Sequence, residues 1–92
     1  MNFVYLMDSI KPLNMDIVHE HVEHLRKLDE AGKLLLCGPF TGCGGGMVVL
    51  ECGDPEEAKV IAESDPFIRE GYKTYELRTL RIANKDNHYG LL

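Results

Sequence analysis

Three histidines within six residues, His19, His21 and His24, are the side chains best suited to acid–base chemistry in this sequence. Imidazole gains or loses a proton near neutral pH, so it can serve as a general acid or base. On a helix that turns about 100° per residue, His21 falls inside the apolar stripe, His24 lies at its edge and His19 near the other margin. A side chain at the edge is partly buried and partly exposed to solvent, which suits proton transfer. Periodicity alone leaves open whether any of the three is more than a surface or core residue.

Asp65 is the second candidate, because it stands directly before Pro66 at the start of a predicted short helical turn. One interpretation is a cap, in which its carboxylate accepts backbone N–H bonds. The other is that it orients a histidine and stabilises the imidazolium form, as carboxylates do in histidine-based catalysis. The two roles are compatible.

Other sites are disfavoured by spacing. His19 and His21 are two residues apart and point to different sides of a helix, and no cysteine or carboxylate stands at a recognised metal spacing. The glycine-rich stretch 42–46 is followed by a predicted strand and lacks the Gly-Lys-Ser/Thr of a phosphate loop. We therefore expect neither a metal nor a cofactor. Of the cysteines, Cys37 and Cys52 are expected to be buried and Cys43 exposed.

The elements that would position these groups follow from hydrophobic periodicity and from glycine and proline. Asp54 and Pro55 mark the firmest helix start, with Glu57 expected to complete a capping box. Strands are predicted at residues 2–8, 33–40, 47–52 and 73–82, and helices at 15–31, from 55, and as one turn over 66–70. The order is βαββαβ, which predicts a ferredoxin-like α+β fold with a four-stranded antiparallel sheet and two helices on one face. Residues 1–82 form the predicted domain and residues 83–92 a C-terminal tail.

The first three strands are apolar on both sides, although a sheet with helices on one face only should alternate apolar and polar residues. In the first strand, for example, Phe3, Tyr5 and Met7 point one way, and Val4 and Leu6 the other. We expect the open face to be covered by a second copy of the chain, giving a homodimer, with further assembly left open.

Composition excludes several classes of protein. The formal net charge is −5 and the acidic residues are spread along the chain, which disfavours nucleic-acid binding. The apolar runs are too short to span a bilayer, the start lacks a signal-type stretch, and the cysteines are odd in number. We expect a cytoplasmic protein without a membrane or nucleic-acid partner.

Four motifs in order resemble the YciI-like (YCII-related) family over residues 1 to about 80. They are His24-Leu25-x-x-Leu28, Gly32-x-Leu34-Leu35, Gly38-Pro39 and Asp65-Pro66-Phe67. The resemblance implies a dimeric α/β barrel and a pocket centred on a histidine and an aspartate, matched here by His24 and Asp65. We expect Tyr5, Gly38, Pro39 and Phe67 to line that pocket.

The resemblance also suggests a reaction class, since one branch of the family resembles a cofactor-free dehydrochlorinase and related barrels include muconolactone isomerase-like enzymes. The resulting hypothesis is a cofactor-independent lyase or isomerase in which His24 is the base and Asp65 holds its tautomer, acting on a small cyclic molecule. The alternatives are a module that binds a small organic ligand without turnover, and a structural or partner-binding dimer.

Overall fold

A computed structural model describes residues 1–91 of the chain. Its elements follow the predicted order, with an additional 3₁₀ segment near the end. They are β1 (Asn2–Ser9), α1 (Met15–Glu30), β2 (Leu34–Pro39), β3 (Gly46–Glu51), α2 (Pro55–Ser64), α3 (Pro66–Arg69), β4 (Lys73–Leu80) and η1 (Lys85–Gly90). The observed bounds lie within two residues of the predicted strands and of the first helix.

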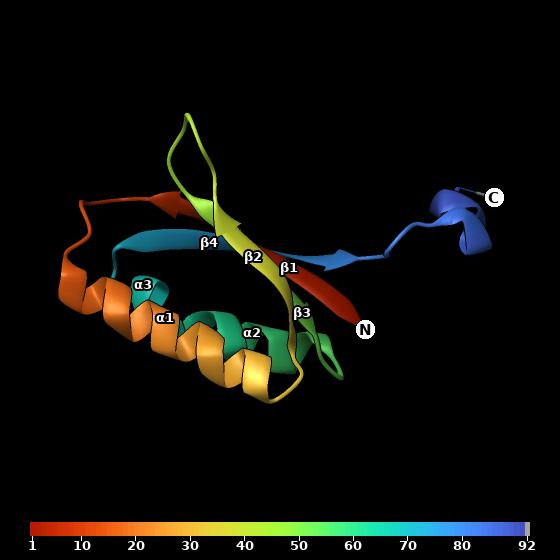
Figure 1. The fold of residues 1–92 in the computed structure, drawn as a ribbon, viewed down its shortest axis with the longest axis horizontal. Helices are drawn as coiled ribbons and strands as arrows, with labels where there is room; N and C mark the ends of the chain where they lie inside the picture. The colour runs from red at the N-terminus through yellow and green to blue at the C-terminus, as the bar shows by residue number, and fades with distance from the viewer. Residues whose placement is uncertain (92) are drawn as a thin grey trace.

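The four strands form one antiparallel sheet in the order β2-β3-β1-β4, and the helices lie on one side of it (Figure 1). This order places the two strands that flank each βαβ half apart in the sheet, as the ferredoxin-like fold requires. The predicted fold class is confirmed.

Local sequence explains where the helices begin and end. Asn14 caps α1 by accepting the Ile17 N–H at 2.9 Å, and Gly32 follows the helix with φ of +73°. Asp54 caps α2 by accepting the Glu57 N–H at 2.8 Å. The Glu57 carboxylate reaches back to the N–H of Gly53 at 3.0 Å, one residue before the cap, so the predicted capping box closes one position early.

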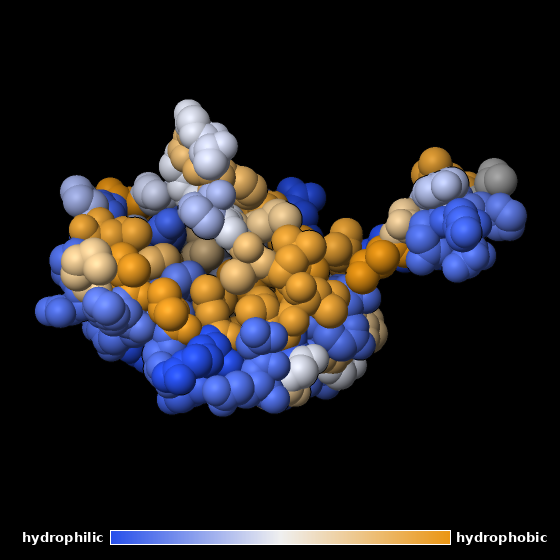
Figure 2. Space-filling model, viewed as in Figure 1, coloured by the Kyte–Doolittle hydropathy of each residue, from blue (hydrophilic) through white to orange (hydrophobic). Residues whose placement is uncertain are grey.

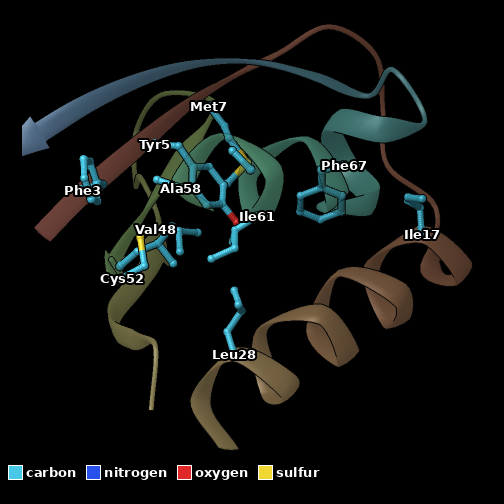
Figure 3. Packing of buried hydrophobic residues seen from close by; sticks show 12 residues of the cluster. Phe3, Tyr5, Met7, Ile17, Leu28, Val48, Cys52, Ala58, Ile61 and Phe67 are labelled. Carbon is cyan, nitrogen blue, oxygen red and sulfur yellow. The ribbon is translucent and has the colours of Figure 1, made fainter. Parts of the chain in front are cut away.

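The core lies between the sheet and the helices. Phe3, Tyr5 and Met7 point from β1 toward the helices, where they meet residues such as Ile61 of α2 and Phe67 of α3 (Figure 3). Each large apolar side chain buried there contributes about 1.5–3 kcal/mol. The same packing fixes the position of the Tyr5 ring, which is fully buried.

A β-bulge in β2 changes one predicted pattern. Leu34 pairs with Leu50, but the next pairing joins Leu36 to Val49, so the register shifts between them. Leu34 and Leu36 therefore lie on opposite faces of the sheet, whereas strict alternation predicts the same face. The bulge also turns Cys37 toward the helix-covered side, where it stays exposed rather than buried as predicted.

The loop between β2 and β3 passes close to β1 through a glycine. Gly45 has φ of +86°, and a Cβ atom there would lie 2.1 Å from the carbonyl oxygen of Met7. Only glycine fits both the conformation and the close approach.

Beyond β4 the chain leaves the body of the protein, and η1 stands apart from it (Figure 1). Asn84 caps this segment, and its side chain accepts the Asp86 N–H at 2.9 Å. The boundary of the predicted tail at residue 83 falls in this linker, and its last residue, Leu92, lies outside the described residues. No helix within residues 1–91 combines the length and apolar character needed to cross a bilayer.

Candidate functional site

The apolar face of α1 carries a histidine toward the interior. Ile17 and Leu28 are buried on this face, and His21 lies four residues after Ile17, one helical turn along. The His21 side chain is 12% exposed. An imidazole in such a position is shielded from bulk water while one edge remains open to a cavity.

A carboxylate meets this histidine from the junction of α2 and α3. Asp65 ends α2 and caps α3, where it accepts the Phe67 N–H at 3.0 Å. Pro66 occupies the first position of α3 and lacks an N–H, so the carboxylate is directed to Phe67. The Asp65 side chain is 0% exposed, which is rare for a carboxylate without partners.

Three groups satisfy the buried carboxylate. His21 Nδ1 lies 2.8 Å from Asp65 Oδ1, and the Tyr5 hydroxyl donates to Asp65 Oδ2 at 2.8 Å. Because a carboxylate oxygen accepts, Nδ1 of His21 carries the proton of this bond, which leaves Nε2 as the basic nitrogen. The cap and the histidine-orienting role of Asp65 therefore occur together.

Burial and hydrogen bonding act in opposite directions on these groups. Burial raises the pKa of the Asp65 carboxyl, but the bonds from His21, Tyr5 and the Phe67 backbone outweigh it and hold that pKa below its usual range. Burial, together with the negative charge of Asp65, raises the pKa of the Tyr5 phenol far above its ordinary value. Asp65 is thus a stable anion and Tyr5 a permanent donor.

Phe67 fixes the plane of the imidazole. Its ring stacks on His21 with a centroid separation of 3.8 Å and an interplanar angle of 12°. The backbone of the same residue binds Asp65, so one short helix orients both members of the pair.

The structure corrects the predicted pairing of Asp65 with His24. Within residues 1–91, the histidine that contacts the carboxylate is His21, and His24 makes no hydrogen bond to it. His24 lies one turn further along α1 beside Ser64 and Arg69, and its buried Nε2 has no partner among the described residues. Burial lowers the pKa of His24, and the charge of Asp65 offsets only part of that effect.

Beside His21 lies an apolar cavity of about 390 Å³, between α1 and the strands β2 and β3. Gly38, Pro39 and Phe67 line it, whereas Tyr5 is not part of the lining and binds Asp65. Val18, Val22 and Leu25 of α1 form the opposite wall. Figure 2 shows apolar side chains gathered along this side of the molecule, above the polar outer surface of α1.

Two residues of the site, His21 and Lys73, are not among the predicted site residues. The signal for His21 is its position inside the apolar stripe, which indicates that its side chain points inward. The family motif His24-Leu25 favours His24 instead. Lys73 also lines the cavity and is buried. Its signal is alternation, because Lys73 shares the helix-facing side of β4 with Tyr75 and Leu77.

Residues 1–91 hold no group of three or more histidine, cysteine, aspartate or glutamate side chains arranged to bind a metal ion. Cys43 is exposed in the glycine loop, as expected. The polar groups at the cavity are His21, which Asp65 holds, and Lys73.

A protein-family model for the YCII-related domain matches residues 1–81. The chain belongs to the YCII-related family. This YCII-related protein is 34% identical over 82 residues to the uncharacterized protein YjpA of Bacillus subtilis strain 168. The match covers 87% of this chain and 96% of that one.

Two solved structures share the fold of this YCII-related domain. One is 5-chloro-2-hydroxyhydroquinone dehydrochlorinase (TftG) from Burkholderia phenoliruptrix AC1100, in complex with 2,5-dihydroxybenzoquinone, with a TM-score of 0.71 and 18% identity. That match covers 94% of this chain and 98% of the other. The second is muconolactone isomerase, with a TM-score of 0.76, 17% identity and 96% of each chain covered. At these identities the likeness establishes the fold.

Proposed function

We propose that this protein is an acid–base enzyme in which His21 is the general base and Asp65 its orienting carboxylate. The substrate is a small cyclic or aromatic-derived molecule bound in the cavity beside His21. The observation that carries the proposal is the 2.8 Å contact between His21 Nδ1 and a fully buried carboxylate. In this proposal His21 takes the catalytic role that the family resemblance implies for His24.

The geometry supports a defined proton path. Asp65 holds the proton on Nδ1, so Nε2 is free to accept one from the substrate. The imidazolium that forms is stabilised by the adjacent carboxylate, which stays ionised because Tyr5 and the Phe67 N–H bind it. Positioned acid–base catalysis of this type contributes on the order of 10²–10⁴ in rate.

The proposed reaction needs no oxidant or reductant. Nε2 removes a proton from a hydroxyl or an activated carbon, and the electron pair left behind forms a new double bond. A leaving group such as chloride then departs with its bonding pair, so the net change is loss of HX. Where no leaving group is present, return of the proton to another carbon gives an isomer. The two structural neighbours, a dehydrochlorinase and an isomerase, belong to these two classes.

The proposal is tested by incubating the wild-type protein with 5-chloro-2-hydroxyhydroquinone and with muconolactone, and following chloride release or isomer formation. We expect turnover of one of these classes, with His21→Gln lowering kcat by about 10²–10⁴. His24→Gln is the matched control, one turn away on the same helix, and should stay within about threefold of wild type. Full turnover by His21→Gln would remove His21 as the base. Ligand binding without turnover would favour the binding-module alternative.

The open face of the sheet supports a homodimer as part of the same proposal. Val4 and Leu6 are half-buried on the side away from the helices, and Leu36 on the same side is 53% exposed. Covering such apolar area gains roughly 25 cal/mol per Å². A second copy of this face is complementary to it by two-fold symmetry.

Mass measurement by light scattering tests the dimer. We expect twice the chain mass for the wild-type protein and the single-chain mass for Leu36→Glu. Thr74→Glu on β4, at the polar edge of the same face, is the control and should leave the mass unchanged. A monomeric wild-type protein would remove the dimer from the proposal.

A further inference from the structure

A buried lysine shares the cavity with His21. Lys73 begins β4 and lies opposite Ser9 of β1, on the side of the sheet that the helices cover. The next residues of β4 on this side are Tyr75 and Leu77, which pack against the core. Lys73 is 8% exposed, and it lines the apolar cavity together with His21.

This ammonium has no anionic partner in the described part of the chain. No salt bridge or side-chain hydrogen bond to Lys73 is found among residues 1–91. The nearby carboxylate of Asp65 already binds three donors, namely His21, Tyr5 and the Phe67 N–H. The ammonium is therefore available to form a charge-assisted hydrogen bond with an anionic group of a ligand in the cavity.

An aromatic ring fixes the position of this ammonium. Lys73 Nζ lies over the Phe67 ring, 4.9 Å from its centroid, in the range of a cation–π interaction. Such a contact attracts the cation to the ring face but does not neutralise its charge. Phe67 therefore positions Lys73 as it positions His21, and it leaves the ammonium protons available.

The rest of the lining specifies the body of the ligand. Among the described residues around the cavity, only Lys73 carries a formal charge, and apart from it and His21 the lining is apolar or glycine. A cavity of about 390 Å³ has room for one small ring system. Apolar walls favour a flat hydrocarbon body, and the ammonium favours a single negative group on it.

We propose that Lys73 is the anion-binding residue of this cavity and that its substrates are planar organic monoanions, with a carboxylate or an ionised ring hydroxyl as the recognised group. Proton removal by His21 would increase the negative charge on such a ligand, and Lys73 would stabilise that charge. The inference deepens the proposed function, on which it rests in treating the bound molecule as a substrate. Binding itself does not depend on turnover.

The test measures binding of neutral and anionic ring compounds by NMR titration of the full chain. We expect benzoate to bind at least about tenfold more tightly than benzamide, which has the same shape without the charge. Binding of 4-nitrophenolate compared with nitrobenzene tells whether an ionised hydroxyl is recognised as well as a carboxylate. Equal binding of the charged and neutral members of both pairs, or no binding of either anion, would overturn the proposal.

Variants assign the preference to one side chain. Lys73→Met keeps length and apolar contact and should abolish the preference for the anion, whereas Lys73→Arg should retain most of it. Lys11→Met removes the same charge outside the cavity, where Lys11 lies 4.3 Å over the Tyr72 ring, and should change nothing. Retention of the preference in a folded Lys73→Met protein would overturn the assignment, and thermal unfolding of each variant shows that it is folded.

His21→Gln separates this inference from the proposed function. The variant should lose turnover and keep its preference for benzoate. If the wild-type protein shows no turnover but its preference for anions depends on Lys73, the enzyme proposal fails and the anion site stands. If turnover is unchanged in Lys73→Met, the enzyme proposal stands and the anion site fails.

Discussion

His21 and His24 lie one turn apart on α1 and meet opposite environments. His21 faces the junction of α2 and α3, where a buried carboxylate binds one ring nitrogen and Phe67 stacks on the ring. His24 faces a polar notch beside Ser64 and Arg69, and its Nε2 has no partner among the described residues. Identical side chains on one helix therefore differ in chemistry because of what a different segment, residues 64–67, presents to each.

This contrast shows that burial alone does not pair an imidazole, because the carboxylate must be presented to it by another segment. A carboxylate can orient an imidazole only where both are held, and holding requires packing on every side. The edge position of His24 buries Nε2 without giving it a partner among the described residues.

Asp65→Asn should remove the difference between His21 and His24, and we expect it to have the largest effect on turnover and stability. The amide cannot hold the imidazolium, so turnover should fall at least about 100-fold, and loss of a charged hydrogen bond should lower the free energy of unfolding by about 1.5–3 kcal/mol. Urea unfolding and the substrate assay measure the two effects.

Asp54→Asn is the matched control for this change, since Asp54 caps α2 at an exposed position. Asparagine caps as well as aspartate, so we expect a change below about 0.5 kcal/mol. Equal effects of the two substitutions would mean that Asp65 acts only as a cap.

Tyr5→Phe should weaken the hydrogen-bonded group around Asp65 without removing the contact between His21 and Asp65. The variant loses the hydroxyl that donates to Asp65 Oδ2 and leaves that oxygen unsatisfied in the core, which should cost about 1–2 kcal/mol of unfolding free energy. Tyr72→Phe, which loses an exposed bond from Asn14, should cost less than about 0.5 kcal/mol. Urea denaturation of both variants tests whether the buried hydrogen bond to Asp65 stabilises the fold more than the exposed bond to Tyr72.

The smallest expected effect concerns His24 and pH. Its folded-state pKa lies below the ordinary 6.5, so the unfolded chain binds a proton more readily than the folded one. The stability contributed by neutral His24 is complete above pH 6.5 and is lost as the pH falls through that value toward the lower, folded-state pKa. His24→Gln should remove this part of the acid sensitivity, measured as unfolding free energy between pH 7.5 and pH 5. An unchanged slope would show that His24 is not desolvated in the folded protein.

Much of the fold could be predicted because its signals are local. Asp54-Pro55 at the start of α2 and Gly32 after α1 are backbone requirements that any surrounding structure must respect. Alternation and helical periodicity then give the order of elements, and the order gives the sheet. Alternation failed at Leu34–Leu36, since a bulge is set by pairing with β3 and leaves no mark in β2 itself.

The sequence by itself determined the inventory of the site: a histidine-bearing helix, an aspartate that caps a short turn, and strands whose helix-facing sides are apolar. Tertiary structure alone decided that His21 rather than His24 meets Asp65, that Tyr5 completes the carboxylate's shell, and that Lys73 enters the same cavity. The physical reason is that helical phase is known from sequence only to within a residue or so. A hydrogen bond of 2.8 Å depends on how α1 and α3 pack, which residues distant in the chain determine together.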